Sequence, residues 1–193
     1  FVWFTYLILF LFKYSFTSWI AGFLLYTIGT VIILQASVIF SIVVIGFLTP
    51  MILRILHKRY YSHLQLHGYG TWFSPIWVLF KSSFMMIFLF VILIPVYFVP
   101  VLNIIAFSIP FYYFFHKLLN FDVSSTILSA EQYKIIYEKE ANNFRLRTLF
   151  LYFISMIPFA TLFTAVYYII YLGHAYFVKL DELKKEEIKL ISN

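Results

Sequence analysis

Three long stretches of this sequence carry no Lys, Arg, Asp or Glu, and they constrain the fold more than any other feature. They cover residues 14–53, 82–115 and 148–178. The chain of 193 residues is 63% hydrophobic and only 11% charged, whereas about a quarter of the residues in an ordinary soluble domain are charged. A soluble fold of this size has too little interior to bury so much apolar surface. We therefore expect an all-α integral membrane protein with long transmembrane helices.

The N-terminal part of the chain has room for two membrane-spanning segments. A bilayer-spanning helix needs about 20 apolar residues, and Lys13 is the only charged residue before Arg54. We expect residues 1–48 to form a transmembrane hairpin with a short turn at Lys13–Ser18. Because the sequence begins at Phe1 inside an apolar run, we also expect that the N-terminus of a longer protein is missing. We treat residues 1–193 as a single membrane domain.

The charged residues predict the orientation in the membrane. Apart from Lys13, the basic residues lie within 54–81, 117–147 and 179–189, and all eight acidic residues lie in the last two of these regions. The positive-inside rule places such regions in the cytoplasm. We expect a multi-pass protein of the inner (plasma) membrane, in contact with membrane lipids, with most charged loops and a C-terminal tail at 180–193 in the cytoplasm.

The segment "LIPVYFVPVLN" divides the second uncharged stretch. Pro95 and Pro100 should break a helix here, yet the segment has no polar residue before Asn103. Each arm between Lys81 and Lys117 is roughly 20–24 Å long at 1.5 Å per residue, which is short of a hydrocarbon core about 30 Å thick. We expect residues 75–117 to form a re-entrant, hemi-penetrating hairpin whose tip contains these three residues.

A second hairpin is predicted within residues 129–178. Ser129 and Gln132 have the spacing of a capping box, which predicts the start of a polar helix. Ile157-Pro158 lies in the middle of the third uncharged stretch and repeats the Ile-Pro pair of the first hairpin, so Pro158 is predicted at the tip. Irregular backbone at membrane depth must be buried in protein or line a watery cavity, which favours a homo-oligomer, a water path or both. Four ordinary proline-kinked spans are the alternative.

Two further segments have recognisable patterns. Gly22, Gly29 and Ala36 are at heptad spacing, and a stripe of small residues lets transmembrane helices pack closely. Residues 50–68 have apolar residues at helical spacing among basic ones, which predicts an interfacial basic helix.

The sequence contains no motif of a known enzyme chemistry. It has no cysteine, no His-Glu-x-x-His, no Gly-x-Ser-x-Gly and no glycine-rich phosphate loop. His63 and His67 have a two-ligand spacing, but zinc requires further ligands, and no acidic residue lies near them in the sequence. We expect no enzyme, no metal, no cofactor and no nucleic-acid partner. A membrane enzyme or haem protein that uses the histidines is the weakest alternative.

The positions of the arginines indicate a protein that binds or transports anions. Arg54 and Arg59 precede the first predicted hairpin, and Arg145 and Arg147 precede the second. The planar guanidinium group suits oxyanions because it donates two parallel hydrogen bonds. If the four arginines converge, they form an electropositive rim below the two hairpins. The uncharged stretches contain no carboxylate, and proton-coupled transport normally leaves one there, so the pattern favours passive flux.

The order and spacing of three segments resemble the CysZ sulfate permease family and the wider family of etoposide-induced proteins. These segments are "GFLTPMILRILHKRY" at 46–60, "LIPVYFVPVLNIIAF" at 93–107 and "LFLYFISMIPFATLFTAVYYIIYLGHAYF" at 149–177. The resemblance implies an oligomeric permease or channel in the bacterial inner membrane. It would pass sulfate or a related oxyanion inward for sulfate assimilation, without ATP. The alternative within the same fold is a non-transporting membrane scaffold or assembly protein.

Overall fold

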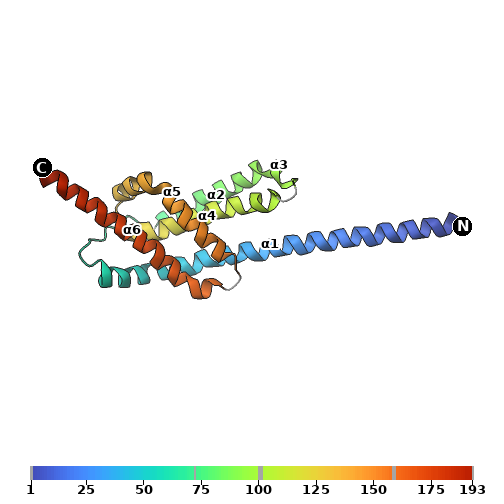
Figure 1. Ribbon diagram of the computed structural model, residues 1–193, viewed down its shortest axis with the longest axis horizontal. Coiled ribbons are helices and arrows are strands. Elements are labelled where there is room, and N and C mark those ends of the chain that lie inside the picture. The colour runs from blue at the N-terminus through green and yellow to red at the C-terminus, as the bar shows by residue number, and fades with distance from the viewer. Residues whose placement is uncertain (1, 72, 100–101, 158–159, 193) are drawn as a thin grey trace. The chain divides into compact units, whose positions relative to one another are not determined.

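The described chain is entirely helical in its regular structure. The computed structural model describes residues 2–71, 73–99, 102–157 and 160–192. Its six helices, shown in Figure 1, are α1 (Val2–Tyr60), α2 (Ser74–Ile92), α3 (Ile94–Tyr97), α4 (Leu102–Ile127), α5 (Ala130–Ser155) and α6 (Ala160–Ser192). No strand occurs within these ranges. The prediction of an all-α protein is confirmed.

Three helices are long and apolar enough to span a membrane. Among the described residues they are Ile32–Tyr60 of α1, Ser74–Ile92 and Leu102–Ile127. Ser82 is the only buried residue of α2, so this helix keeps most of its apolar side chains at least partly exposed, although one side of it contacts α4. Helices of this kind are stable only where lipid replaces water around them.

Helix α1 differs from the predicted N-terminal hairpin. It is helical from Val2 to Tyr60, so the expected turn at Lys13–Ser18 is absent. The reason is local, because residues 13–18 contain no Gly or Pro to end a helix. Residues 1–36, the N-terminal part of α1, form one unit of the chain, and residues 37–193 form the second.

The predicted interfacial helix at 50–68 is shorter than expected. Pro50 lies inside α1, which ends at Tyr60. The chain then packs as a loop against the end of α4, where the backbone N–H groups of His67 and Tyr69 donate to the carbonyls of Ile127 and Leu128 at 3.2 and 3.1 Å. A Cβ atom at Gly68 would lie 2.9 Å from the Ser125 carbonyl oxygen. Glycine is therefore needed for this close approach.

The two predicted breaks between helices are present. Helices α2 and α4 pack against each other, with α3 and the adjoining residues between them. Helix α5 ends at Ser155 and α6 begins at Ala160, and these two helices also contact each other. The capping box is confirmed, since Ser129 Oγ accepts from the Gln132 N–H at 3.2 Å and Gln132 Oε1 accepts from the Ser129 N–H at 3.0 Å. Helix α6 continues to Ser192 through the predicted tail.

A buried polar network joins α4, α5 and α6, which cross one another in the second unit (Figure 1). The Tyr176 hydroxyl donates to Asn120 Oδ1 at 2.7 Å, and Asn120 Nδ2 donates to the His116 carbonyl at 2.8 Å. The His116 ring lies 2.6 Å from Thr148 Oγ1 and 3.0 Å from the Tyr137 hydroxyl. Helix α4 therefore finds polar partners on both α5 and α6.

Helix α1 packs on α6 at a glycine. A Cβ atom at Gly173 would lie 2.7 Å from Leu53 Cδ2 and 3.2 Å from Leu56 Cδ2, and both leucines are buried. The absence of a side chain at Gly173 lets the two helices approach closely. The core around this contact contains the largest buried aromatic side chains of α4, α5 and α6, namely Phe115, Phe144, Tyr152, Tyr168, Tyr176 and Phe177.

We predict that Tyr176→Phe lowers the free energy of unfolding by roughly 1–3 kcal/mol, because it leaves the buried Asn120 oxygen without a donor. The matched control is Tyr167→Phe, since Tyr167 is 46% exposed and should change stability by less than about 0.5 kcal/mol. Denaturant unfolding in mixed micelles measures both values. Equal stability of the two variants would show that the network contributes nothing.

We predict that Gly173→Ala destabilises the protein relative to Gly29→Ala by about 1–3 kcal/mol, because its methyl group overpacks the Leu53 contact. A Cβ atom at Gly29 would meet no described atom within 4 Å. The same unfolding measurement compares them. If Gly173→Ala is as stable as Gly29→Ala, the close α1–α6 contact is not required.

Candidate functional site

The four arginines predicted as an electropositive rim lie on two helices. Arg54 and Arg59 are exposed on the last turns of α1, and the Arg59 guanidinium lies 5.5 Å from the centre of the Tyr60 ring. On α5, exposed Arg145 donates from Nη1 to Asn142 Oδ1 at 3.3 Å. Arg147 is half-buried and donates from Nε to Asn143 Oδ1 at 2.9 Å.

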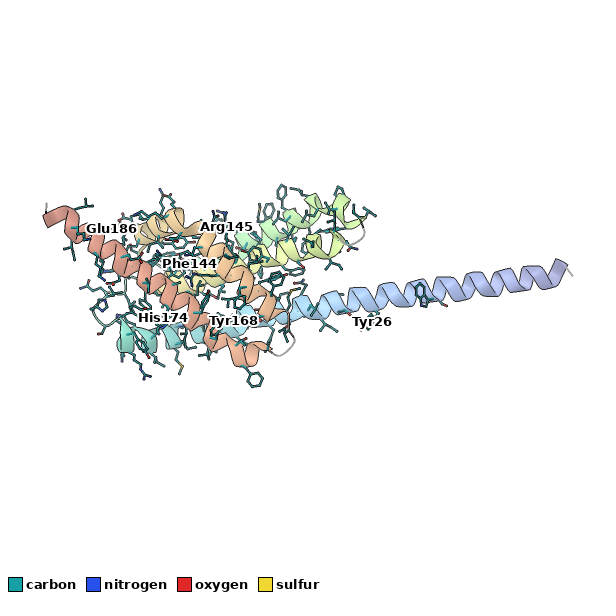
Figure 2. The ribbon with its side chains drawn as sticks, in the orientation of Figure 1. Tyr26, Phe144, Arg145, Tyr168, His174 and Glu186 are labelled. Atoms are coloured by element: carbon teal, nitrogen blue, oxygen red, sulfur yellow. The ribbon has the colours of Figure 1, made fainter. Side chains whose placement is uncertain are left out.

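Arg147 lines a groove between α5 and α6. The groove encloses about 440 Å³, and its polar lining comes from Asn143, Arg147, His174 and Lys179. The Arg147 guanidinium lies 5.2 Å from the centre of the Tyr171 ring, which forms part of the same wall. Figure 2 labels Phe144 of α5 and His174 of α6, which both line this groove. The site is an open, aromatic groove with three basic side chains.

The basic groups of the groove differ in how far they are neutralised. Lys179 Nζ lies 2.7 Å from Glu140 Oε1 and 2.9 Å from Glu182 Oε2. Hydrogen bonds with these two carboxylates raise the pKa of Lys179, and the hydrogen bond from Lys179 lowers the pKa of Glu140. No salt bridge involves Arg147 among the described side chains. Of the Lys179 and Arg147 side chains, Arg147 is therefore the one without a salt bridge in the described part of the chain, although its charge also helps to lower the pKa of Glu140.

Aromatic contacts attach the end of α1 to α6 beside the groove. The Tyr61 hydroxyl lies 2.8 Å from His174 Nδ1, and its ring stacks on Phe177 with a centroid distance of 4.5 Å. The Tyr60 ring, next to Arg59, lies 5.8 Å from the His174 ring. Arg147 thus contacts α6 directly, whereas Arg59 is linked to α6 only through the neighbouring Tyr60 ring. The convergence of the four arginines into a rim stays a prediction.

The residues predicted at the hairpin tips are only partly described. Pro95 is exposed in the single-turn helix α3, and half-buried Asn103 lies in the first turn of α4, where its N–H donates to the Val99 carbonyl at 3.1 Å. Pro100 and Pro158 lie outside the described residues. Membrane insertion of either tip stays a prediction.

The small residues predicted as a packing stripe lie on α1. A Cβ atom at Gly22 or Gly29 would meet no described atom within 4 Å, and Ala36 is exposed. The stripe therefore leaves room for another helix, and its partner stays a prediction.

His57, His63 and His116 lie within hydrogen-bonding distance of protein oxygen atoms. His57 Nε2 lies 2.7 Å from the Leu64 carbonyl oxygen, and His63 Nε2 lies 3.3 Å from Asp181 Oδ1. His116 belongs to the buried polar network. In the part of the chain that the structure describes, no group of three His, Cys, Asp or Glu side chains could hold a metal ion.

The sequence analysis does not predict a second basic pocket or a carboxylate within a candidate membrane span. Lys81 and Lys117 line a second pocket, between α2 and α4. In addition, the Asp122 carboxylate lies in the candidate span Leu102–Ile127 and faces Gly46, where a Cβ atom would be 3.5 Å from its Oδ2. The predicted hairpin arm ends at Lys117, whereas α4 continues to Ile127, because residues 118–127 contain no Gly or Pro to end a helix.

Comparison with known proteins identifies a family for most of the chain. The family model described as "Sulfate transporter CysZ/Etoposide-induced protein 2.4" (EI24) matches residues 1–165. No curated protein and no solved structure shows a significant match. The family match agrees with the three apolar helices, which make this a multi-pass membrane protein. Because the match covers most of the 193 residues, the chain belongs to the EI24 family of sulfate transporter CysZ and etoposide-induced protein 2.4.

Proposed function

We propose that this protein is an oxyanion permease or channel that passes sulfate through the bacterial inner membrane, passively, for sulfate assimilation. The match of residues 1–165 to a family that includes a sulfate transporter is the observation that carries the proposal. The α5–α6 groove supports it, because Arg147 there has no carboxylate within salt-bridge distance among the described residues. Arginine binds tetrahedral oxyanions through charge-assisted hydrogen bonds.

The proposed topology places the charged regions in the cytoplasm and both hairpin tips at membrane depth. The described part of the connection between α2 and α4 supports this, since it carries exposed apolar side chains such as Phe98, which is 81% exposed, and Ile94, which is 49% exposed. Large apolar side chains at a turn are stable in lipid but not in water. Under this proposal the groove, with its charged residues, faces the cytoplasm.

A homo-oligomer is part of the proposal. Irregular backbone at membrane depth must be covered by protein or line a watery cavity, and a second subunit packed on the exposed side chains of the first hairpin, such as Phe98, can cover it. The stripe of Gly22, Gly29 and Ala36 offers a second place for such packing, since a Cβ atom at either glycine would meet no described atom within 4 Å.

We predict that Arg147→Gln lowers sulfate uptake into liposomes by about tenfold or more at subsaturating sulfate, because it removes a charge-assisted hydrogen bond worth roughly 1.5–3 kcal/mol. The control is Lys134→Gln, which removes one positive charge from an exposed position on the same helix. Its uptake should stay within twofold of the unmodified protein. Equal uptake by both variants would exclude Arg147 from the transport route.

We predict that an imposed inward proton gradient leaves sulfate uptake unchanged, because passive flux moves no proton with the anion. Asp122→Asn should behave in the same way, although an acidic side chain within a span is the usual carrier in proton-coupled transport. Uptake is measured with and without a proton ionophore. Stimulation by the gradient that disappears in Asp122→Asn would replace the passive mechanism with proton coupling at Asp122.

A further inference from the structure

A second pocket opens between α2, α4 and the loop that precedes α2. It encloses about 680 Å³, and its polar lining includes Thr71, Ser74, Lys81 and Lys117. This volume lies within the range of about 300–1,000 Å³ that is typical of small-molecule pockets. The pocket shares no lining residue with the α5–α6 groove, so it is a separate site from the one used in the proposed transport function.

The pocket is strongly suited to an anion. Its lining contains two lysines and no carboxylate. Neither pocket lysine forms a salt bridge among the described side chains. Lys117 Nζ lies 5.9 and 5.5 Å from the ring centres of Tyr113 and Tyr137, which hold it at the pocket wall.

Hydroxyl groups at the pocket add hydrogen-bonding capacity. Thr71 Oγ1 and Ser74 Oγ lie 2.6 Å apart, and the Thr71 N–H donates to Ser74 Oγ at 3.1 Å. Both residues are accessible, with Thr71 exposed and Ser74 half-buried. Two ammonium groups with neighbouring hydroxyls match the charge and the acceptor oxygens of a phosphate group.

Above the two lysines, the exposed surface becomes entirely apolar. On α2, Trp77 lines the pocket, and Phe84 and Phe88 follow at helical spacing with exposed fractions of 68% and 48%. On α4, Ile109 and Ile105 precede Lys117 and are 41% and 58% exposed. Both rows run from the lysines toward the connection between α2 and α4. A free inorganic anion gains nothing from such a surface, whereas acyl chains do.

The depth of the pocket agrees with a lipid ligand. Lys81 and Lys117 flank residues 82–115, which contain no charged residue. They therefore lie where the apolar hairpin meets the polar interface, and Trp77 lies beside them as in an interfacial aromatic belt. Basic pockets between membrane helices at this depth bind phospholipid headgroups.

We infer that the pocket holds the phosphate group of an anionic phospholipid between Lys81 and Lys117, with its acyl chains along the exposed faces of α2 and α4. This inference is independent of the proposed transport function, because it rests on a different pocket. The bound phosphodiester bridges the two arms of the hairpin and fixes its depth in the membrane.

Native mass spectrometry of the full chain in detergent, titrated with phosphatidylglycerol or phosphatidylcholine, tests the inference. Phosphatidylglycerol should bind more tightly than phosphatidylcholine. The double variant Lys81→Gln/Lys117→Gln should bind phosphatidylglycerol about 20- to 30-fold more weakly, because each basic residue at a membrane surface contributes about fivefold. The matched control Lys58→Gln/Lys134→Gln removes the same charge from exposed positions outside the pocket, and its affinity should stay within twofold.

Two further measurements complete the test. The variant Lys81→Arg/Lys117→Arg keeps both positive charges and should retain phosphatidylglycerol binding, so it distinguishes a loss of charge from a loss of folding. Circular dichroism checks the helicity of every variant. Inorganic phosphate, which has no acyl chains, should not displace phosphatidylglycerol at about 10 mM. Equal binding of both lipids, or unchanged binding by the double glutamine variant, overturns the inference. Displacement by inorganic phosphate also overturns it, because the pocket is then a free-anion site.

Discussion

Polar groups inside an apolar environment must find partners within the protein, and the rest of this structure follows from that constraint. Helices satisfy the backbone, so the side-chain polar groups determine where helices cross. Asn120 on α4 is satisfied by Tyr176 on α6, and His116 on α4 lies within hydrogen-bonding distance of Thr148 and Tyr137 on α5. These contacts hold α4, α5 and α6 together, while α2, which packs on α4, leaves many large apolar side chains exposed for contact with lipid.

The positions of helices could be predicted from the sequence where a local signal exists. The capping box at Ser129 and the break at Pro95 are local, and both are present in the structure. The expected turn after Lys13 rested on a single charge without a helix breaker, and α1 continues through it. Contacts between distant residues could not be predicted, because Tyr176 lies 56 residues from Asn120. The location of Lys81 and Lys117 in one pocket could not be predicted either, because it depends on how the two arms of the hairpin pack.

The basic residues of this chain divide into groups with different partners. Lys179 is neutralised by Glu140 and Glu182, whereas Arg147 of the α5–α6 groove forms no salt bridge among the described side chains. Lys81 and Lys117 lie in an acid-free pocket at the base of an apolar hairpin. A count of positive charges predicts only orientation and general attraction to anionic lipid. The arrangement of carboxylates around the basic side chains separates the proposed transport site from the proposed lipid site.

Sulfate flux through the purified protein tests the central claim most directly. Radiolabelled sulfate uptake is measured in liposomes that contain the protein, and in empty liposomes of the same lipid. The proposed permease predicts uptake that exceeds the empty liposomes, saturates with sulfate concentration and is inhibited by selenate. Uptake no greater than in empty liposomes, from protein shown to be folded, would contradict the permease. It would favour a non-transporting scaffold of the same family.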